Sequence, residues 1–367
     1  MRFARLAFAA ALLAAVPLTA LADEIRFLDE ERDPLSNVEI SGVDFKTVTY
    51  KFLDEDKRAA GEQKEDMKKV KEIVFEVKPP DYESAEAYYE KGNYASAVQA
   101  FRRAMKDSSR NGWVDQYALH RIALCHQAVG DSAKAAETYA ELLKAFPNTV
   151  LLAESRLALA DLSLAGGKPK EAKKSLEELA QIVKANNLNK RWGYQASLAL
   201  YRITEAEGDV DAAKKGYRTL AQESESDAKE VHYRAKLGYA RCILQEDQNE
   251  ASRTFQELTR AEDLTDTAVL AGAWNGVAVC YFEQKDFKSA LLAALHVVTM
   301  YQDATEEMAQ AYFCAAACYF ILRDKDNGAG WEGRSADLYG RLHDEYPGSP
   351  WSRENYKSTS TMVRKAR

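Results

Sequence analysis

The sequence predicts a mainly α protein: an α–α superhelix, or α-solenoid, preceded by a small antiparallel β module. Three observations support this prediction. Apolar and polar residues alternate with a period of two in short segments of residues 23–80, a helical period begins at Asp81, and a helix–turn–helix pattern then recurs in about seven copies. A chain of 367 residues also exceeds a usual single core. We therefore expect three parts: a signal peptide at 1–22, the β module at 23–80, and the solenoid of helical hairpins at 81–367.

Residues 1–22 have the features of a secretory signal peptide. Arg2 and Arg5 precede an apolar run, which ends in the small-residue site Ala20-Leu21-Ala22. We expect cleavage after Ala22 and a soluble mature protein that is periplasmic or secreted. The alternative is an uncleaved membrane anchor, but the run is short for a span and lacks a basic stop. No second long apolar run follows, so we expect no transmembrane segment in the mature chain.

The balance of charges bears on the kind of partner. The formal net charge is -7, and it becomes more negative when the two arginines of the signal peptide are removed. Binding to nucleic acid normally requires a basic face. The composition therefore argues against a nucleic-acid partner.

Four short segments of the β module alternate apolar and polar residues, as half-buried strands do. They are 24–28, 37–41, 47–52 and 72–77. Asp33-Pro34 and Ser41-Gly42 predict turns, and the charged stretch 54–69 predicts a solvated loop. Because so small a sheet has little core of its own, we expect it to pack on the helices. Pro79-Pro80 marks the boundary, since proline neither continues a strand nor sits inside a helix.

From Asp81 onward the same turn recurs between helical stretches. It appears as Gly92-Asn93, Gly130-Asp131, Gly167-Lys168, Gly208-Asp209, Lys285-Asp286 and, less regularly, near Gly330. A turn glycine supplies the backbone freedom that ends a helix. Small and aromatic residues then follow at helical spacing, for example Ala97, Phe101 and Ala104 at i, i+4 and i+7. Such residues form one stripe of a helix, which packs against the preceding helix.

This pattern resembles the tetratricopeptide repeat (TPR). One unit carries most of the family's set: Trp274, Val277-Ala278, Tyr281, Asp286, Phe287 and Ala290. The resemblance covers about 280 residues and implies a solenoid whose first helices line a concave face. The units are spaced by about 37–45 residues, longer than usual for the family, and look most like those of bacterial envelope repeat proteins.

The cysteines and histidines offer no catalytic or metal-binding constellation. Cys125, Cys242, Cys280 and Cys318 recur at one position of the repeat, where a small buried residue is expected, whereas a catalytic or metal-binding cysteine is single or clustered. Cys314 lies one helical turn from Cys318, so a disulfide or a metal pair is the alternative there. The five histidines are scattered without ligand spacing. We therefore expect no enzyme, no cofactor and no metal.

The exposed side chains of the first helices are the candidate binding surface. Arginines stand in the middle of the predicted face and aromatic residues at its ends, which suits a polypeptide with an acidic centre and apolar flanks. The alternative is an ordinary helix surface, with Phe313 and Phe320 packed against a neighbouring repeat or the chain's own tail. The candidate partner-binding residues are Tyr82, Tyr89, Tyr117, His120, Arg202, Arg234, Arg241, Asn275, Phe282, Phe313 and Phe320.

Repeat architecture without a catalytic motif predicts a non-catalytic scaffold or adaptor that binds protein or peptide partners in the bacterial envelope. The lysines of the clamp by which some TPR proteins hold chaperone tails are missing at the matching positions. A second hypothesis is binding of a glycan or peptidoglycan fragment through the β module and the groove tyrosines. A third is an enzyme that uses the cysteines. The sequence leaves the oligomeric state open.

Overall fold

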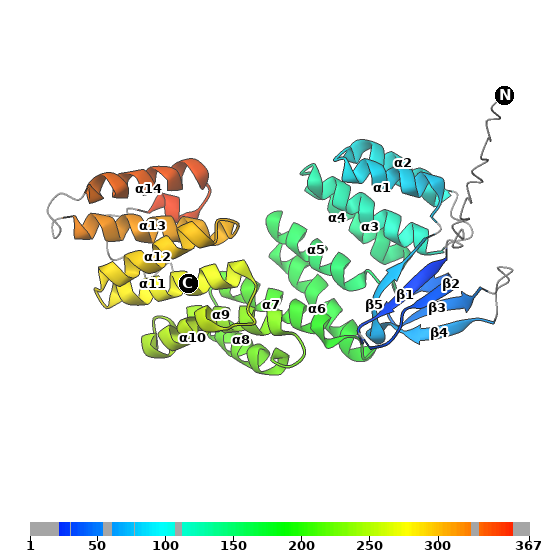
Figure 1. Cartoon of the computed structure of the whole chain (residues 1–367), viewed down its shortest axis with the longest axis horizontal. Coiled ribbons are helices and arrows are strands. Elements are labelled where there is room, and N and C mark those ends of the chain that lie inside the picture. Colours follow the sequence, from blue (N-terminus) through cyan, green and yellow to red (C-terminus); the bar gives the residue numbers. More distant parts are fainter. Residues whose placement is uncertain are drawn as a thin grey trace, which may run out of the picture. The chain divides into compact units, whose positions relative to one another are not determined.

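A computed structural model describes residues 22–29, 31–53, 61–76, 78–106, 112–323 and 330–354. They form two compact units, which we call unit 1, up to Ser155, and unit 2, from Arg156 onward. Unit 1 holds an antiparallel sheet and two helical hairpins, and unit 2 holds further hairpins of the same kind (Figure 1). The predicted fold class, a TPR-like solenoid with an N-terminal antiparallel sheet, is confirmed. Of the predicted signal peptide, all but Ala22 lies outside the described residues.

Five strands form one antiparallel sheet in the order β4-β3-β2-β1-β5. They are β1 (Asp23–Phe27), β2 (Leu35–Val43), β3 (Thr47–Phe52), β4 (Gln63–Asp66) and β5 (Val70–Val74). A three-residue 3₁₀ turn, η1 (Met67–Lys69), links β4 to β5, although these strands lie at opposite edges. A flat sheet of five strands would be about 19 Å wide, whereas this link reaches about 14 Å. The sheet must therefore coil so that its edges approach each other.

The predicted turn at Ser41-Gly42 is wrong. Both residues lie inside β2, where the register with β3 shifts between Ile40 and Gly42. The chain turns later, at Asp44, whose carboxylate accepts hydrogen bonds from the backbone N–H groups of Lys46 at 2.7 Å and Thr47 at 2.8 Å. Glycine occurs both in turns and at irregularities within strands, so the sequence signal was ambiguous.

The predicted solvated loop at 54–69 is also wrong in part. Its last residues form β4 and η1, while 54–60 lie outside the described residues. β4 is charged because it is an edge strand with both faces largely exposed, and such strands lack the apolar alternation of a half-buried strand.

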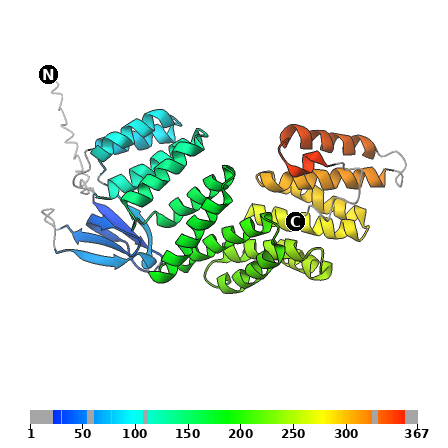
Figure 2. The same ribbon diagram turned by 180° about the vertical axis from the view of Figure 1, so that it is seen from behind.

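Fourteen α-helices follow in the described part of the chain, and they pair in order as seven helical hairpins, α1 with α2 through α13 with α14. Their bounds are α1 (Pro80–Glu90), α2 (Tyr94–Lys106), α3 (Gly112–Ala128), α4 (Ser132–Ala145), α5 (Leu152–Ala165), α6 (Pro169–Ala185), α7 (Lys190–Ala206), α8 (Val210–Ser224), α9 (Lys229–Ile243), α10 (Gln248–Arg260), α11 (Thr267–Glu283), α12 (Phe287–Met300), α13 (Thr305–Leu322) and α14 (Trp331–Glu345). A short 3₁₀ turn, η2 (Pro350–Arg353), ends the described chain. Figure 2 shows the hairpins of unit 2 from behind, with α11 to α14 side by side. Within the described residues, no helix combines the length and the apolar character needed to cross a membrane.

The sheet and the first helices of unit 1 share one core. Ile25 and Val48 are buried together with Phe101 of α2, and Phe75 stacks on Trp113 of α3 with ring centroids 3.9 Å apart. The sheet thus gains from the helices the apolar contacts that it is too small to supply itself. The predicted domain limits, 23–80 and 81–367, remain a prediction.

The turns between paired helices follow the predicted pattern. Gly130 has a φ of 76°, and Asp131 then caps α4 by accepting a hydrogen bond from the backbone N–H of Lys134 at 3.1 Å. Lys285 takes the same left-handed conformation, with a φ of 61°, although it carries a side chain. The unit without a turn glycine keeps only the cap, Asp247 on α10. The capping acid is thus present even where the glycine is absent.

Glycines in unit 2 leave space for aromatic rings at the contacts between neighbouring helices. A Cβ on Gly276 of α11 would lie 2.5 Å from the ring of Phe255, and one on Gly238 of α9 would lie 2.8 Å from the ring of Tyr217. Both rings are buried. These contacts fix how each helix sits on the one before it, and they bring α7, α9, α11 and α13 into one series, each touching the next.

Candidate functional site

A cavity of about 680 Å³ opens on the series of first helices in unit 2. We call it the arginine pocket, because Arg202 of α7 and Arg234 and Arg241 of α9 all line it. Apolar side chains, among them Leu198 and Leu237, line it as well, and five consecutive residues at the start of α13 and just before it, 303–307, complete the lining. The structure therefore brings together the three arginines that the sequence singled out.

Arg241 is held by a buried network at the side of the pocket. Its Nη2 lies 2.7 Å from Oε1 of Glu307, and the two side chains are 26% and 11% exposed. Burial alone would lower the pKa of Arg241, but Glu307 raises it above its ordinary value. Asn275 completes the network: its Nδ2 donates to the backbone oxygen of Glu307 at 2.9 Å and to Oε2 at 3.1 Å. Arg241 thus has its charge compensated within the protein.

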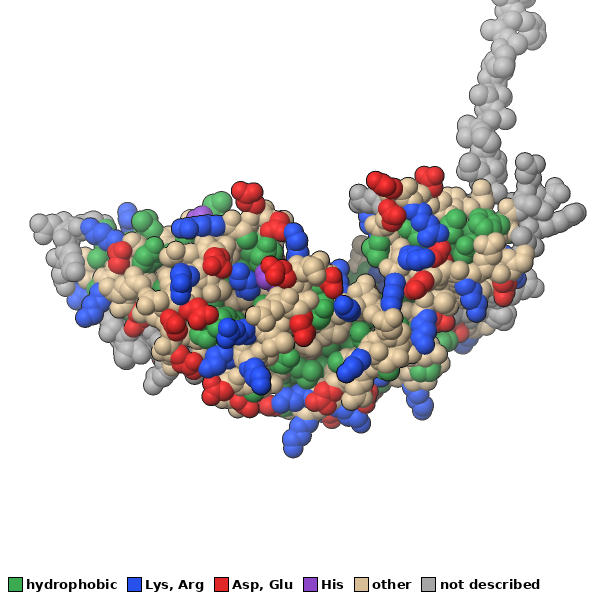
Figure 3. Space-filling model, turned by 90° about the horizontal axis from the view of Figure 1, so that it is seen from below, with side chains coloured by type: hydrophobic (Ala, Val, Ile, Leu, Met, Phe, Trp, Pro, Cys, Tyr) green, Lys and Arg blue, Asp and Glu red, His purple; other side chains and the backbone are tan. Residues whose placement is uncertain are grey.

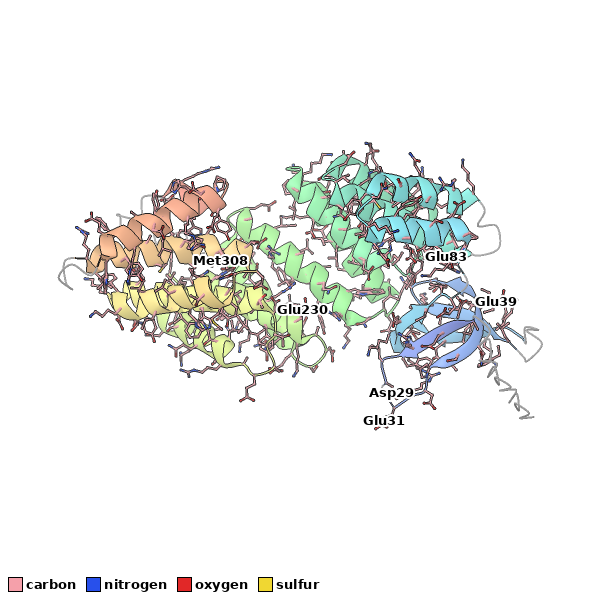
Figure 4. All side chains as sticks on the ribbon, turned by 45° about the horizontal axis from the view of Figure 1, so that its top comes forward. Asp29, Glu31, Glu39, Glu83, Glu230 and Met308 are labelled. Atoms are coloured by element: carbon pink, nitrogen blue, oxygen red, sulfur yellow. The ribbon has the colours of Figure 1, made fainter. Side chains whose placement is uncertain are left out.

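Arg234 is also paired, whereas Arg202 is not. Nε of Arg234 lies 2.7 Å from Oδ2 of Asp266, and its Nη1 lies 3.3 Å from Oε1 of Glu230 near the start of α9, which Figure 4 labels. Arg202 is exposed and forms no ion pair with any residue that the structure describes, although its charge acts on the carboxylate of Asp161, whose pKa it lowers against the larger effect of burial. Of the three guanidinium groups, only that of Arg202 is therefore available to an incoming anion without breaking an existing pair.

The pocket also carries four carboxylates, so it is not a basic site. Besides Glu307, they are Glu205, which accepts a hydrogen bond from the hydroxyl of Tyr217 at 2.9 Å, Asp303 and Glu306. Asp303 accepts one from Thr267 at 2.7 Å, and Glu306 is exposed at the start of α13. Charges of both signs therefore face the cavity.

The predicted residues of unit 1 make aromatic contacts with neighbouring side chains, and Tyr82 and Tyr117 both pack edge-on to Trp113. Tyr82 is buried, edge-on to Phe101 with ring centroids 5.2 Å apart, so the expectation that it faces a partner is wrong. Tyr89 is half-buried, with the guanidinium of Arg121 5.1 Å from its ring centroid. Tyr117 is half-buried beside Phe75.

His120 of α3 is neutral at pH 7. Its side chain is 16% exposed, with Nε2 3.8 Å from Oε2 of Glu154. Burial and then the charge of Arg121 lower the pKa of His120 to about 4. It packs edge-on to Tyr139 at 5.7 Å and so contributes to the core more than to the surface.

Three predicted positions of unit 2 are core residues, so they do not offer a surface to a partner. Asn275 and Phe282 are buried in α11. Phe313 is fully buried and packs against Trp351 of η2, with ring centroids 5.2 Å apart. The alternative that Phe313 packs inside the protein therefore holds for this residue. Phe320 is half-buried beneath the guanidinium of Arg323, 3.7 Å from its ring centroid. The apolar flanks expected for the groove are therefore largely core.

The five cysteines are free and buried, as expected for packing residues. Cys314 and Cys318 form no disulfide, and their thiols are hydrogen-bonded to each other. Among the described residues, no group of three or more histidine, cysteine, aspartate or glutamate side chains could hold a metal ion.

Two other surfaces, the face shown in Figure 3 and the β-sheet, offer no comparable group of charged or aromatic side chains among the described residues. On the face shown in Figure 3, lysine and arginine side chains are intermixed with aspartate and glutamate side chains. In the sheet, Phe27, Tyr50 and Phe75 are buried and Phe52 is half-buried. These rings belong to the core and do not form an exposed platform for a sugar.

Sequence reasoning missed the residues that shape the pocket between the arginines. Gly272 of α11 leaves the space in which the pair forms, because a Cβ there would lie 2.8 Å from Nη2 of Arg241 and 3.3 Å from Oε1 of Glu307. Glu307 is 66 residues from its partner, so no local spacing links them. A glycine in the middle of a predicted helix is the one signal in the sequence that marks close contact at this point.

Comparisons with known proteins agree with this fold. The family model of the tetratricopeptide repeat matches residues 81–108 and 117–149. A tetratricopeptide repeat protein from Parabacteroides merdae is 17% identical, with 77% of this chain and 97% of that chain covered and a TM-score of 0.53. Also similar are pilF of Pseudomonas aeruginosa, at 15% identity, 64% and 94% coverage and a TM-score of 0.44, and BtubC of P. vanneervenii, at 16% identity, 62% and 94% coverage and a TM-score of 0.45. No curated protein sequence matches the chain. Residues 81–108 and 117–149 of this chain are therefore tetratricopeptide repeats, and the chain folds as a TPR-like α-solenoid with an N-terminal sheet.

Proposed function

We propose that this protein is a non-catalytic scaffold that binds a protein or peptide partner in the bacterial envelope, through the face formed by its first helices. One observation carries the proposal: Arg202, Arg234 and Arg241, from two neighbouring repeats, line one cavity of about 680 Å³. Stacked repeats present such surfaces to extended ligands, and a cleft of about 300–1,000 Å³ suits a short segment of a partner.

A substitution that fills the arginine pocket tests whether the pocket binds the partner. Ala206 of α7 is exposed and lines the cavity, whereas Ala212 of α8 is also exposed but does not line it. Ala206→Trp should abolish capture of the partner from envelope extracts, and Ala212→Trp should leave capture unchanged. Arg202→Ala/Arg234→Ala should weaken capture as well. Arg241 stays in place, since its removal would leave Glu307 buried without its cation.

Cross-linking then locates the contact. A photoreactive amino acid at Ala268, which lines the pocket, should form a covalent adduct with the captured protein, and one at Ala212 should not. Equal capture by both tryptophan variants, together with no adduct at Ala268, would remove the pocket from the proposed function.

The proposed envelope location is supported by the sequence of the expected signal peptide and by the place of Asp23 in the sheet. Asp23 follows the expected cleavage site and is the first residue of β1. It is buried, and its carboxylate accepts hydrogen bonds from the backbone N–H groups of Ile40 and Glu76, each at 3.0 Å. N-terminal sequencing of protein from a periplasmic fraction should give Asp23 as the first residue. Protein that starts at Met1 in the cytosolic fraction would contradict export.

A further inference from the structure

We infer that the arginine pocket binds a dipolar peptide segment, one that carries a carboxylate for Arg202 and a basic side chain for Glu306 and Asp303. The inference rests on the proposed function and names the chemistry of its ligand. It differs from the polypeptide with an acidic centre that the sequence suggested, because the cavity holds acids that the sequence did not place there.

The lining of the cavity carries charged groups of both signs. Three arginines face four carboxylates, and two of the arginines already have partners: Arg241 pairs with Glu307 at 2.7 Å and Arg234 with Asp266 at 2.7 Å. A segment with several acidic residues would find one free guanidinium, Arg202, and would be repelled by the remaining carboxylates. Like charges brought together in a partly desolvated cleft disfavour binding.

Charged groups of the cavity that form no ion pair stand at different helices. Arg202 projects from α7, the first helix of the series, whereas Asp303 and Glu306 stand at the start of α13, the last. Between them lie apolar residues of α7, α9 and α11, including Leu237 and Val269. A ligand that satisfies both ends must therefore carry an acid and a base separated by small or apolar residues.

The charged groups at both ends of the cavity can bind a ligand without breaking a buried interaction of the protein. Arg202 and Glu306 are exposed, and neither is part of the buried network of Arg241 and Asn275. The carboxylate of Asp303 accepts one hydrogen bond, from the hydroxyl of Thr267, which leaves it capacity for a cation. These groups are therefore available to a ligand without loss of the ion pairs of Arg234 and Arg241.

The test uses calorimetric titration of the mature protein with blocked synthetic peptides. In each peptide one glutamate and one lysine stand one to about five residues apart, in both orders, in an alanine and leucine background, which covers spacings up to about 17 Å. Matched peptides replace the glutamate, the lysine or both by glutamine, and one further peptide carries two glutamates. We expect a glutamate–lysine peptide to bind about tenfold tighter than either singly charged version, as for loss of one charge-assisted hydrogen bond.

Variants assign each charge to its partner. Arg202→Gln should remove the advantage of the glutamate and keep that of the lysine, and Glu306→Gln should do the reverse. Arg253→Gln and Glu262→Gln, exposed in the same unit but outside the cavity, should change neither. Thermal unfolding of each variant checks that the fold is retained.

Two outcomes would overturn the inference: tighter binding of the two-glutamate peptide, or no peptide that gains from carrying both charges. Either result leaves the scaffold proposal standing if the photoreactive residue at Ala268 still captures a partner. Failure of that cross-link together with a positive titration would instead remove the proposed partner while keeping the pocket's preference for dipolar segments.

Discussion

Replacement of Gly276 by alanine tests how the repeats of unit 2 interlock. The added Cβ would lie 2.5 Å from Cδ1 and Cε1 and 2.6 Å from Cδ2 of Phe255, well inside van der Waals contact. Phe255 is fully buried, so its ring cannot retreat into solvent. Such overpacking lowers the free energy of unfolding by up to about 3 kcal/mol. The better helix propensity of alanine raises it by about 1 kcal/mol. We expect a net loss of about 2 kcal/mol in the free energy of unfolding.

Gly340→Ala is the matched control. Gly340 lies in the middle of α14, and nothing is within 4 Å of a Cβ there, so the same substitution should stabilise the protein by up to about 1 kcal/mol. Urea unfolding measures both variants, and hydrogen exchange of α10 and α11 shows where the loss occurs. Combining Gly276→Ala with Phe255→Leu should reduce the cost of the alanine. If Gly276→Ala proves as stable as Gly340→Ala, ring-on-glycine packing does not set the position of these helices.

Three further predictions follow from buried charged and thiol groups. Arg241→Met alone should lower the free energy of unfolding by about 3 kcal/mol, the lower end of the range for a buried pair because Arg241 is 26% exposed, since it leaves Glu307 buried without a cation. Adding Glu307→Leu should recover most of the loss. Equal free energies of unfolding in urea for the wild type and both variants would show that solvent screens this ion pair. Folding lowers the pKa of His120 to about 4, so between pH 6.5 and 4 the unfolded state binds a proton that the folded state does not. The free energy of unfolding should therefore be highest above the ordinary pKa of about 6.5 and should decline by up to about 3 kcal/mol as the pH falls toward 4. His120→Gln should flatten that decline, and an unchanged slope of unfolding free energy against pH would refute the assignment. All five thiols should react with a disulfide reagent in denaturant and none within minutes in the native protein, since each is buried; rapid labelling of one native cysteine would contradict this.

The repeat architecture could be predicted because its signals are local. A turn such as Gly130-Asp131 combines a left-handed glycine with a helix cap within two residues, and the stripe of Ala97, Phe101 and Ala104 needs only one helix to be recognised. The sheet was predicted less well, because Gly42 in a strand and the charged strand β4 give signals that turns and loops share. Four short strands carried enough alternation to be found, and the fifth did not.

The candidate site was predicted in part. The helical period placed Arg202, Arg234 and Arg241 on one predicted face, and they do line one cavity. The same period assigned Tyr82 and Phe313 to that face, although neighbouring elements bury both. A helix has two flanks beside its exposed stripe, and sequence periodicity does not tell which of them the next element covers.

By itself, the sequence determined where most paired helices turn and which residues form the stripe between them, because caps, turn glycines and helical spacing act over a few residues. Only the tertiary structure decided which charges meet. Glu307 reaches Arg241 from 66 residues away, and the register that allows this depends on the fit of Phe255 and Tyr217 on glycines of the following helices. That fit is set by the volume and direction of side chains on two helices at once, and this is why a face that the sequence described as basic contains charges of both signs.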